Sequence, residues 1–203
     1  MANYRTSRII PVILVIVIII IAIAALVSLA RVVFFSGSNS ATAEQIDVSR
    51  DTLLNTSVGH RVTMTVRGPI VADEKFHSYK IDISPDARTI NTYTGYLGTV
   101  VSQEALGNNV ASYEEFVHAL DKAELAKGDQ FEGDKNDTRG ICATGRVYQF
   151  SIYDGATEVK NLWTSTCGGS KGSLDASVEQ LTSLFVNQLP SATSLIKKIS
   201  LAS

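Results

Sequence analysis

The chain has 203 residues, of which 45% are hydrophobic and 19% charged, and its formal net charge is −2 at pH 7. Three arginines and no acidic residue lie in the first 31 positions, so residues 32–203 carry 15 basic and 20 acidic side chains, a net charge of −5. Binding to a nucleic acid backbone needs clustered Lys and Arg, so this composition excludes nucleic acid as a predicted partner.

Residues 9–30 read IIPVILVIVIIIIAIAALVSLA and contain no charged residue. A helix of this length measures about 33 Å, which is enough to cross a hydrocarbon core of about 30 Å. It is apolar all round and has no polar face to turn toward water. The stretch therefore predicts a single transmembrane helix, with the lipid bilayer as its partner.

The residues that flank this helix predict its orientation. Arg5 and Arg8 precede it and only Arg31 follows closely, so the positive-inside bias places the N-terminus in the cytoplasm. The side chain of Arg31 can extend to the outer interface, where Phe34 and Phe35 lie at headgroup depth. We therefore expect a single-pass protein of the cell membrane with an extracytoplasmic C-terminal domain.

A cleaved signal peptide is the alternative to an anchor. The small residues of SLA at 28–30 and ATA at 41–43 suit a signal peptidase. The apolar run exceeds the usual length of a signal peptide core, about 7–15 residues. Its length favours an uncleaved anchor.

The rest of the chain divides into a tether and one folded domain. The stretch SGSNSATAEQ is small, polar and free of aromatic residues, as in a flexible linker. About 155 residues remain beyond it, enough for one hydrophobic core. The predicted organisation is a cytoplasmic tail at 1–8, the transmembrane helix and outer interface at 9–35, a flexible linker at 36–48 and an extracytoplasmic domain at 49–203.

Alternating apolar residues predict the strands of the domain. RVTMTVRGPI, at 61–70, alternates as a half-buried strand does. FHSYKIDISPDARTINTY, at 76–93, predicts two strands around a central Pro-Asp turn, with Ile90 opposite Ile81. YLGTVVSQEAL, at 96–106, predicts a further short strand.

Two helices are predicted between and after these strands. SYEE fits a capping box in which Ser112 begins a helix, and Gly128 is a plausible end. Apolar residues at helical spacing predict a second helix over 175–189, which we expect to pack across the sheet. Residues 191–203 form either a short amphipathic turn or a frayed end. Strands with two interspersed helices and no strict βαβ alternation predict an α+β fold with a mainly antiparallel sheet.

The two cysteines of the chain, Cys142 and Cys167, bracket a predicted long β-hairpin. A two-residue turn at Asp154-Gly155 suits a type I′ turn, and in that register the cysteines lie directly opposite each other. Such a pair has Cα atoms about 4.5 Å apart, within the range of a disulfide, which an exported domain is expected to form.

The same register places Gln149 opposite Lys160 and Arg146 opposite Trp163. A three-residue loop at 153–155 is the alternative, and it shifts the pairing by one position. Cys142 then lies opposite Thr166.

Residues that carry chemistry are scattered along the chain. His60, His77 and His118 have no metal-ligand spacing, and no GxSxG elbow is present. The cysteines are too far apart for a CxxC redox motif. No catalytic, cofactor-binding or metal-ligating residue is predicted.

Two loops suit a ligand by composition alone. GGSKGS, at 168–173, precedes the second helix and can present backbone N–H groups to an anion, but a plain connector explains it as well. The loop 129–140 contains Asp129, Glu132, Asp134 and Asp137, yet it fails the EF-hand pattern, which favours a solvated loop. The sequons at Asn55 and Asn136 have meaning only in a eukaryotic secretory pathway.

The layout, an N-terminal apolar helix followed by a sheet domain with a late cysteine pair, is similar in outline to type IV pilins. Pilins carry a prepilin peptidase site and a glutamate just inside the apolar helix, whereas the first Glu here is Glu44. The sequence favours a membrane-anchored binding, scaffolding or envelope-assembly component that contacts an unknown protein or surface ligand. The alternatives are an envelope hydrolase with a dispersed active site and a pilin-like assembly subunit.

Overall fold

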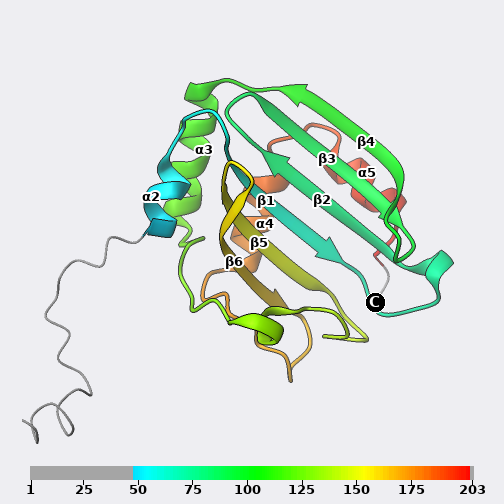
Figure 1. Cartoon of the computed structure of the whole chain (residues 1–203). Coiled ribbons are helices and arrows are strands. Elements are labelled where there is room, and N and C mark those ends of the chain that lie inside the picture. The colour runs from blue at the N-terminus through cyan, green and yellow to red at the C-terminus, as the bar shows by residue number, and fades with distance from the viewer. Residues whose placement is uncertain (1–47, 202–203) are drawn as a thin grey trace, which may run out of the picture. The chain divides into compact units, whose positions relative to one another are not determined.

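A six-stranded antiparallel sheet is the centre of the computed structural model, which describes residues 48–201 (Figure 1). The strands are β1 (His60–Arg67), β2 (His77–Ile83), β3 (Ala87–Thr94), β4 (Thr99–Gly107), β5 (Val147–Asp154) and β6 (Thr157–Ser165). The first four form a meander, and β5 pairs with the other side of β1, so the order is β4-β3-β2-β1-β5-β6. The predicted α+β class and mainly antiparallel sheet are confirmed.

The predicted transmembrane helix lies outside the described residues, together with the cytoplasmic tail and Arg5, Arg8, Arg31, Phe34 and Phe35. The linker lies outside them as well, except for its last residue, Val48. Within the described part of the chain, no helix has the length and apolar character that crossing a bilayer requires.

Four α-helices accompany the sheet within residues 48–201, where two were predicted. They are α2 (Val48–Leu54), α3 (Val110–Lys122), α4 (Val178–Val186) and α5 (Ala192–Lys198), and two short 3₁₀ helices, η1 (Asp73–Lys75) and η2 (Gly133–Asn136), lie in the loops. The helices α2 and α5 have only seven residues each, too few for a clear helical period. The predicted start of α3 is also wrong, since Asn109 caps it by accepting from the Ser112 N–H at 2.9 Å.

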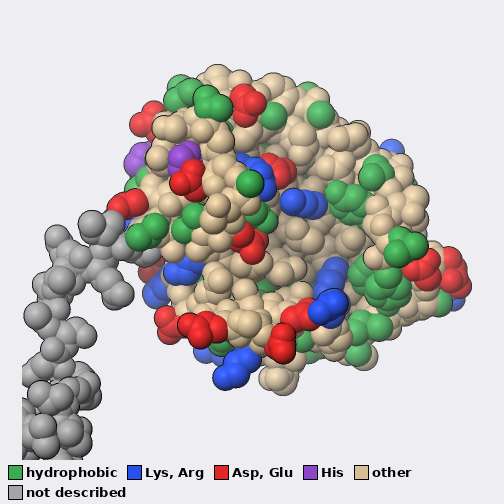
Figure 2. All heavy atoms as spheres, in the orientation of Figure 1, with side chains coloured by type: hydrophobic (Ala, Val, Ile, Leu, Met, Phe, Trp, Pro, Cys, Tyr) green, Lys and Arg blue, Asp and Glu red, His purple; other side chains and the backbone are tan. Residues whose placement is uncertain are grey.

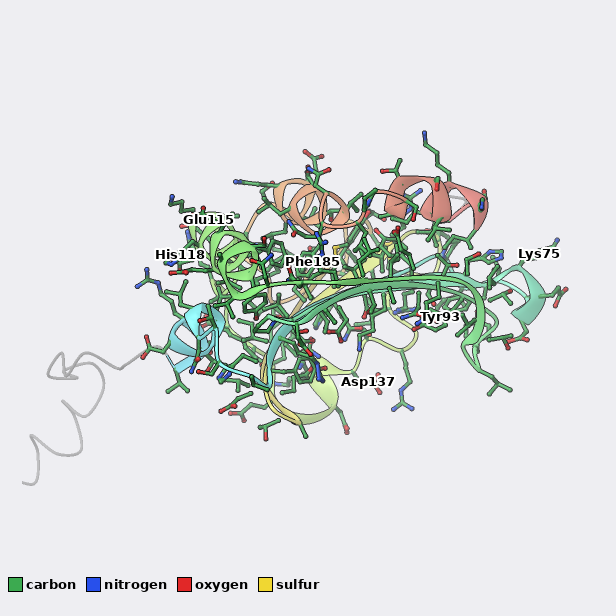
Figure 3. The ribbon with its side chains drawn as sticks, turned by 90° about the horizontal axis from the view of Figure 1, so that it is seen from above. Lys75, Tyr93, Glu115, His118, Asp137 and Phe185 are labelled. Atoms are coloured by element: carbon green, nitrogen blue, oxygen red, sulfur yellow. A yellow bond between two sulfur atoms is a disulfide. The ribbon has the colours of Figure 1, made fainter. Side chains whose placement is uncertain are left out.

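Helices α4 and α5 cover one face of the sheet (Figures 1 and 3). Phe185 of α4 is fully buried, and its ring centroid lies 5.9 Å from that of Phe150 in β5 and 5.3 Å from that of Phe116 in α3. This contact confirms that the helix predicted over 175–189 packs across the sheet. The apolar residues predicted for β1 and β2 face the same core, and Ile81 pairs with Ile90 as expected.

The β5–β6 hairpin forms, but its predicted register is wrong by three positions. Asp154 pairs with Thr157, so the turn residues are Gly155 and Ala156 rather than Asp154 and Gly155. Gly155 has φ 57°, which suits the first central position of a type II′ turn. The change of turn residues displaces the pairing by two positions. An irregularity between Ile152 and Tyr153 displaces it by one position more.

This register places different side chains opposite each other. Gln149 pairs with Trp163 rather than with Lys160, and the predicted pairing of Arg146 with Trp163 is wrong as well. Phe150 pairs with Leu162, so Leu162 takes the core position. Because side chains alternate along a strand, Trp163 points to the other face of the sheet.

The predicted disulfide between Cys142 and Cys167 is confirmed, with a Cα–Cα distance of 5.4 Å. The cysteines are not paired strand residues, because Cys142 precedes β5 and Cys167 follows β6. Cys142 has φ 56°, a left-handed conformation that no strand position adopts. The bond therefore fastens a loop to the end of the hairpin.

Candidate binding surface

The face of the sheet opposite α4 and α5 carries polar side chains, and no α-helix of residues 48–201 lies across it (Figures 1 and 3). Alternation along each strand sets this face apart from the apolar one. Figure 2 shows it from the front, hollowed and with charged side chains gathered along the hollow. We call it the open face, and it comprises Arg61, Thr63, Thr65, Ser78, Lys80, Asp82, Thr89, Asn91, Tyr93, Gln103, Gln149, Ser151 and Tyr153.

Three charged residues form a trio on the open face. The Asp82 carboxylate lies 3.5 Å from Arg61 Nε and 3.8 Å from Lys80 Nζ, and each of the three side chains is about one third exposed, at 29%, 31% and 36%. The Arg61 guanidinium also lies 4.0 Å from the centroid of the Tyr153 ring, a cation–π distance. The trio therefore presents two hydrogen-bond donor side chains, Arg61 and Lys80, and one acceptor, Asp82, to a ligand bound on this face.

The electrostatics of the trio reflect its partial burial. Burial raises the pKa of the Asp82 carboxyl, and the positive charges of Lys80 and Arg61 oppose this shift. Burial also raises the pKa of Tyr93, and the charge of Asp82 adds to the effect. Holding a carboxylate where its ionised form is disfavoured costs stability, and such positions are frequent at functional sites.

A loop over residues 128–146, the wall loop, covers the β5–β6 side of this face. Its Phe131 and Ile141 pack with Trp163, Val147 and Cys142 into a small second core, in which the centroids of Phe131 and Trp163 are 5.9 Å apart. The disulfide closes this core.

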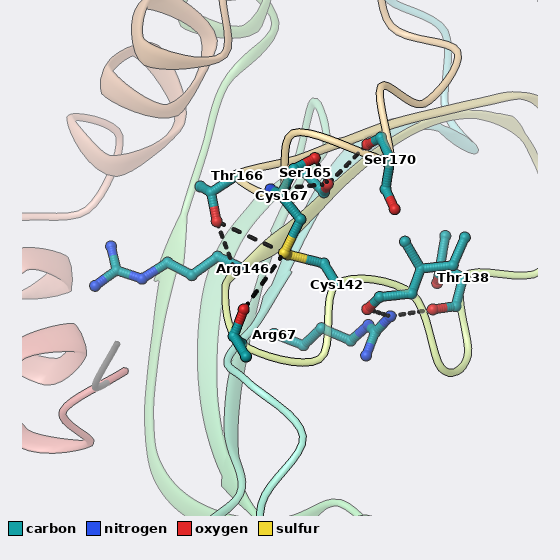
Figure 4. The surroundings of a disulfide bond; sticks show 10 residues. Arg67, Thr138, Cys142, Arg146, Ser165, Thr166, Cys167 and Ser170 are labelled. Carbon is teal, nitrogen blue, oxygen red and sulfur yellow. Dashed lines mark hydrogen bonds between the residues drawn. A yellow bond between two sulfur atoms is a disulfide. The ribbon is translucent and has the colours of Figure 1, made fainter.

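Hydrogen bonds join the wall loop to β1 and the segment after it. Arg67 donates to the carbonyls of Thr138 and Ile141, the latter at 3.0 Å (Figure 4). The Ile70 N–H donates to the Ala143 carbonyl at 2.8 Å. The wall loop therefore borders the open face as a fixed boundary.

The β3–β4 end of the molecule carries an exposed apolar patch. Figure 2 shows hydrophobic side chains gathered there beside acidic ones. Tyr96 orders the patch, since its hydroxyl donates to the Val71 carbonyl at 2.8 Å and its ring stacks on Phe76 at 4.1 Å. We call it the tip patch, and it comprises Ile70, Val71, Tyr96, Leu97, Val100 and Val101.

The three histidines do not converge on one site. His60 begins β1 and His77 begins β2, and these antiparallel strands place them at opposite ends of the sheet. His60 Nε2 lies 3.5 Å from Asp154 Oδ1, and His118 is exposed on α3. The dispersed hydrolase site considered above has no such cluster to build on among the described residues.

The two candidate ligand loops form hydrogen bonds of their own within residues 48–201. In the acidic loop, Asp137 accepts from Arg139 Nε at 2.7 Å, and the residues from 48 to 201 hold no group of three His, Cys, Asp or Glu placed to bind a metal ion. In the 168–173 loop, the Ser173 N–H donates to the Trp163 carbonyl at 2.9 Å and the Ser173 hydroxyl accepts from the Trp163 N–H. That loop covers the outer edge of β6.

The open face was not recognised as a site from the sequence. The alternation that makes it polar is visible in RVTMTVR and in YKIDI. Which face the helices cover, and where the wall loop lies, depends on contacts between segments far apart in the chain. No protein-family model matches the sequence, and no curated protein matches it either.

Proposed function

We propose that this chain is a single-pass, membrane-anchored extracytoplasmic protein whose domain binds a partner protein or a surface ligand on the open face. The uncharged run at 9–30 supports the anchor. The bond between its only two cysteines supports an oxidising compartment. An open polar sheet face suits a binding or scaffolding role in an envelope assembly better than it suits catalysis.

The observation that carries the binding proposal is the half-buried trio of Arg61, Lys80 and Asp82 on the open face. Amide groups of Asn91, Gln103 and Gln149 lie in one row with Lys80, because these residues are paired across neighbouring strands. Amides both donate and accept hydrogen bonds. The surface therefore suits an extended polar ligand that offers both donors and acceptors.

Charge reversal at Lys80 tests the binding proposal. Lys80→Glu changes the sign of one charge on the open face, and Lys197→Glu makes the same change on α5, on the covered side of the sheet. Full-length protein of each kind is crosslinked in its own membrane, purified and analysed for the molecules bound to it. We expect Lys80→Glu to lose molecules that wild type and Lys197→Glu retain. If the wild type and both variants retain the same molecules, the open face is not the binding surface.

A fractionation experiment tests the anchor separately. Full-length protein should remain in the membrane pellet after alkaline carbonate extraction, and protease added outside should digest the domain. N-terminal sequencing should find the chain intact before residue 30. A soluble domain that begins just after residue 30 or residue 43 would instead identify a cleaved signal peptide.

A further inference from the structure

The two edge strands of the sheet, β4 and β6, differ in whether other segments cover their outer edges. The outer edge of β6 is occupied, since the Ser173 and Leu174 N–H groups donate to the Trp163 carbonyl at 2.9 and 3.0 Å, and the Asn161 N–H donates to Gln130 Oε1 at 2.6 Å. On β4, the backbone groups find their partners in β3 alone, as far as residues 48–201 show. The outer edge of β4 is thus an open row of donors and acceptors.

Strand β4 carries only some of the features that protect an edge strand from pairing, since it has an irregularity near Val101 and a charged residue, Glu104, on its helix side, but no Lys or Pro. Lysine, proline, bulges and inward-pointing charges are the usual protection. The strand TVVSQEALG has no Lys or Pro, and the carboxylate of its only charged residue, Glu104, accepts from the Ser191 N–H at 3.3 Å. An irregularity lies near Val101, but Ser102–Gly107 pair regularly with β3.

Exposed apolar side chains are concentrated along this edge. Of the nine large hydrophobic residues that are exposed within residues 48–201, five lie between residues 96 and 110. Leu97 is 97% exposed, and Val100 and Val101 are 54% and 50% exposed. Val110, 52% exposed, lies just beyond the other end of β4. Clustered exposure of this kind marks an interaction surface.

We propose that β4 pairs antiparallel with β4 of a second copy of this chain, which joins two sheets edge to edge. The strand is complementary to itself about a two-fold axis at Gln103. Ser102 then lies opposite Glu104 of the second copy, and Val101 opposite its Ala105, so no like charges meet and apolar residues face each other.

The ends of the strand fit the same arrangement. Antiparallel pairing brings Tyr96 and Leu97 of one copy toward Val110 at the far end of β4 in the other. The exposed apolar residues at the two ends thus cover each other. A lipid surface fits the tip less well, because Asp73 and Glu74 lie beside it, and the Asp73 carboxylate accepts from the Tyr96 N–H at 2.7 Å. Of the residues that define the open face, only Gln103 lies on the pairing strand, so the rest of that face remains free in the dimer.

Cysteine crosslinking in the native membrane tests this inference. Both natural cysteines are consumed in the disulfide, so an introduced cysteine is the only free thiol. Gln103→Cys places it on the proposed axis, and Gln180→Cys places it on the exposed side of α4 as a matched control. Under mild oxidation we expect Gln103→Cys to run mainly as a covalent dimer on a non-reducing gel and Gln180→Cys as a monomer.

A second variant guards against a folding defect at position 103. Val101→Lys places a charge on the edge, and we expect it to abolish the dimer of the solubilised full-length protein in sedimentation while leaving its melting temperature near that of wild type. A monomeric wild type would overturn the proposal, as would Gln103→Cys crosslinking no better than Gln180→Cys. Crosslinking of Gln103→Cys to a different protein would also overturn it and would identify a heterologous strand as the occupant.

Discussion

At the residue scale, Asp82 is the residue of the open face whose carboxylate form is disfavoured by burial. It is paired with Thr63 and Thr89 across neighbouring strands, and its two cationic partners lie at 3.5 and 3.8 Å. Burial nevertheless dominates and raises its pKa above the ordinary value. The ionised carboxylate is therefore a net cost to the fold, which is the pattern expected of a group kept for binding.

Asp82→Asn should reveal this cost through the dependence of stability on pH. Because the folded-state pKa of Asp82 is raised, its contribution to stability is full below the ordinary value of 3.8 and is lost as pH rises through the raised pKa. The neutral isostere avoids this loss. We expect Asp82→Asn to match wild type in acid and to melt at a higher temperature near neutral pH, as measured by circular dichroism. A lower melting temperature at neutral pH would show that the ion pairs outweigh burial.

Close packing around the disulfide requires glycine at position 145. A Cβ at this position would overlap Thr166 Oγ1 and lie 2.8 Å from Cys142 Sγ. Gly145→Ala should therefore destabilise the domain by about 1–3 kcal/mol through overpacking, as measured by chemical denaturation. Gly168→Ala is the matched control, because a Cβ there meets no atom within 4 Å. Equal stability of the two variants would contradict the close packing around the disulfide.

At the scale of elements, the β5–β6 hairpin shows how a correct pairing of cysteines can follow from an incorrect register. Moving the turn from Asp154-Gly155 to Gly155-Ala156 shifts the pairing by two positions and leaves each side chain on its face. The irregularity between Ile152 and Tyr153 adds one position more, which places Leu162 in the core and Trp163 against Phe131. Packing decides between turns of similar local energy. The disulfide forms anyway, because the five-residue approach from Cys142 to Val147 is irregular and lets Cys142 reach Cys167.

The disulfide should stabilise the wall loop more than the hairpin itself. It joins residues 25 apart in sequence, which corresponds to roughly 3–4 kcal/mol in the chain-entropy model. We expect a double variant, Cys142→Ser with Cys167→Ser, to lose stability of that order in chemical denaturation. Limited proteolysis should then cut within residues 128–146 first. An unchanged cleavage pattern would show that Arg67 and the Phe131–Trp163 contact suffice to hold the loop.

At the scale of the whole molecule, one main core holds α3, α4 and α5 against the sheet, while the opposite face stays polar. Phe185 touches both α3 and β5 through its ring contacts. Phe185 therefore connects α4, near the C-terminus, with α3 and β5, which come earlier in the chain. Within residues 48–201, the open face, the tip patch and the outer edge of β4 remain exposed.

Phe185→Ala should therefore destabilise the entire domain in a single transition. The loss expected for a buried phenylalanine is about 3–5 kcal/mol, measured by denaturant unfolding followed by both fluorescence and circular dichroism. Gln103→Ala, on exposed β4, should change stability by less than about 0.5 kcal/mol. Separate transitions for the two probes would show that the helices and the sheet do not form one cooperative unit.

The sequence by itself determined the elements whose signals are local. The alternation in β1, the Ile81–Ile90 pairing across a Pro-Asp turn and the helix that carries Phe185 were all predicted, because each depends on residues close together in the chain. The short helices α2 and α5 were missed because seven residues show too little of a helical period.

The tertiary structure alone decided the register of the β5–β6 hairpin, the side of the sheet on which Trp163 lies and the contacts of Asp82 with Arg61 and Lys80. It also decided which edge of the sheet is covered, since Ser173 and Gln130 reach β6 and no described segment reaches the outer side of β4. The physical reason is the same in each case. Local propensities leave several nearly equal arrangements, and burial against distant segments selects one of them.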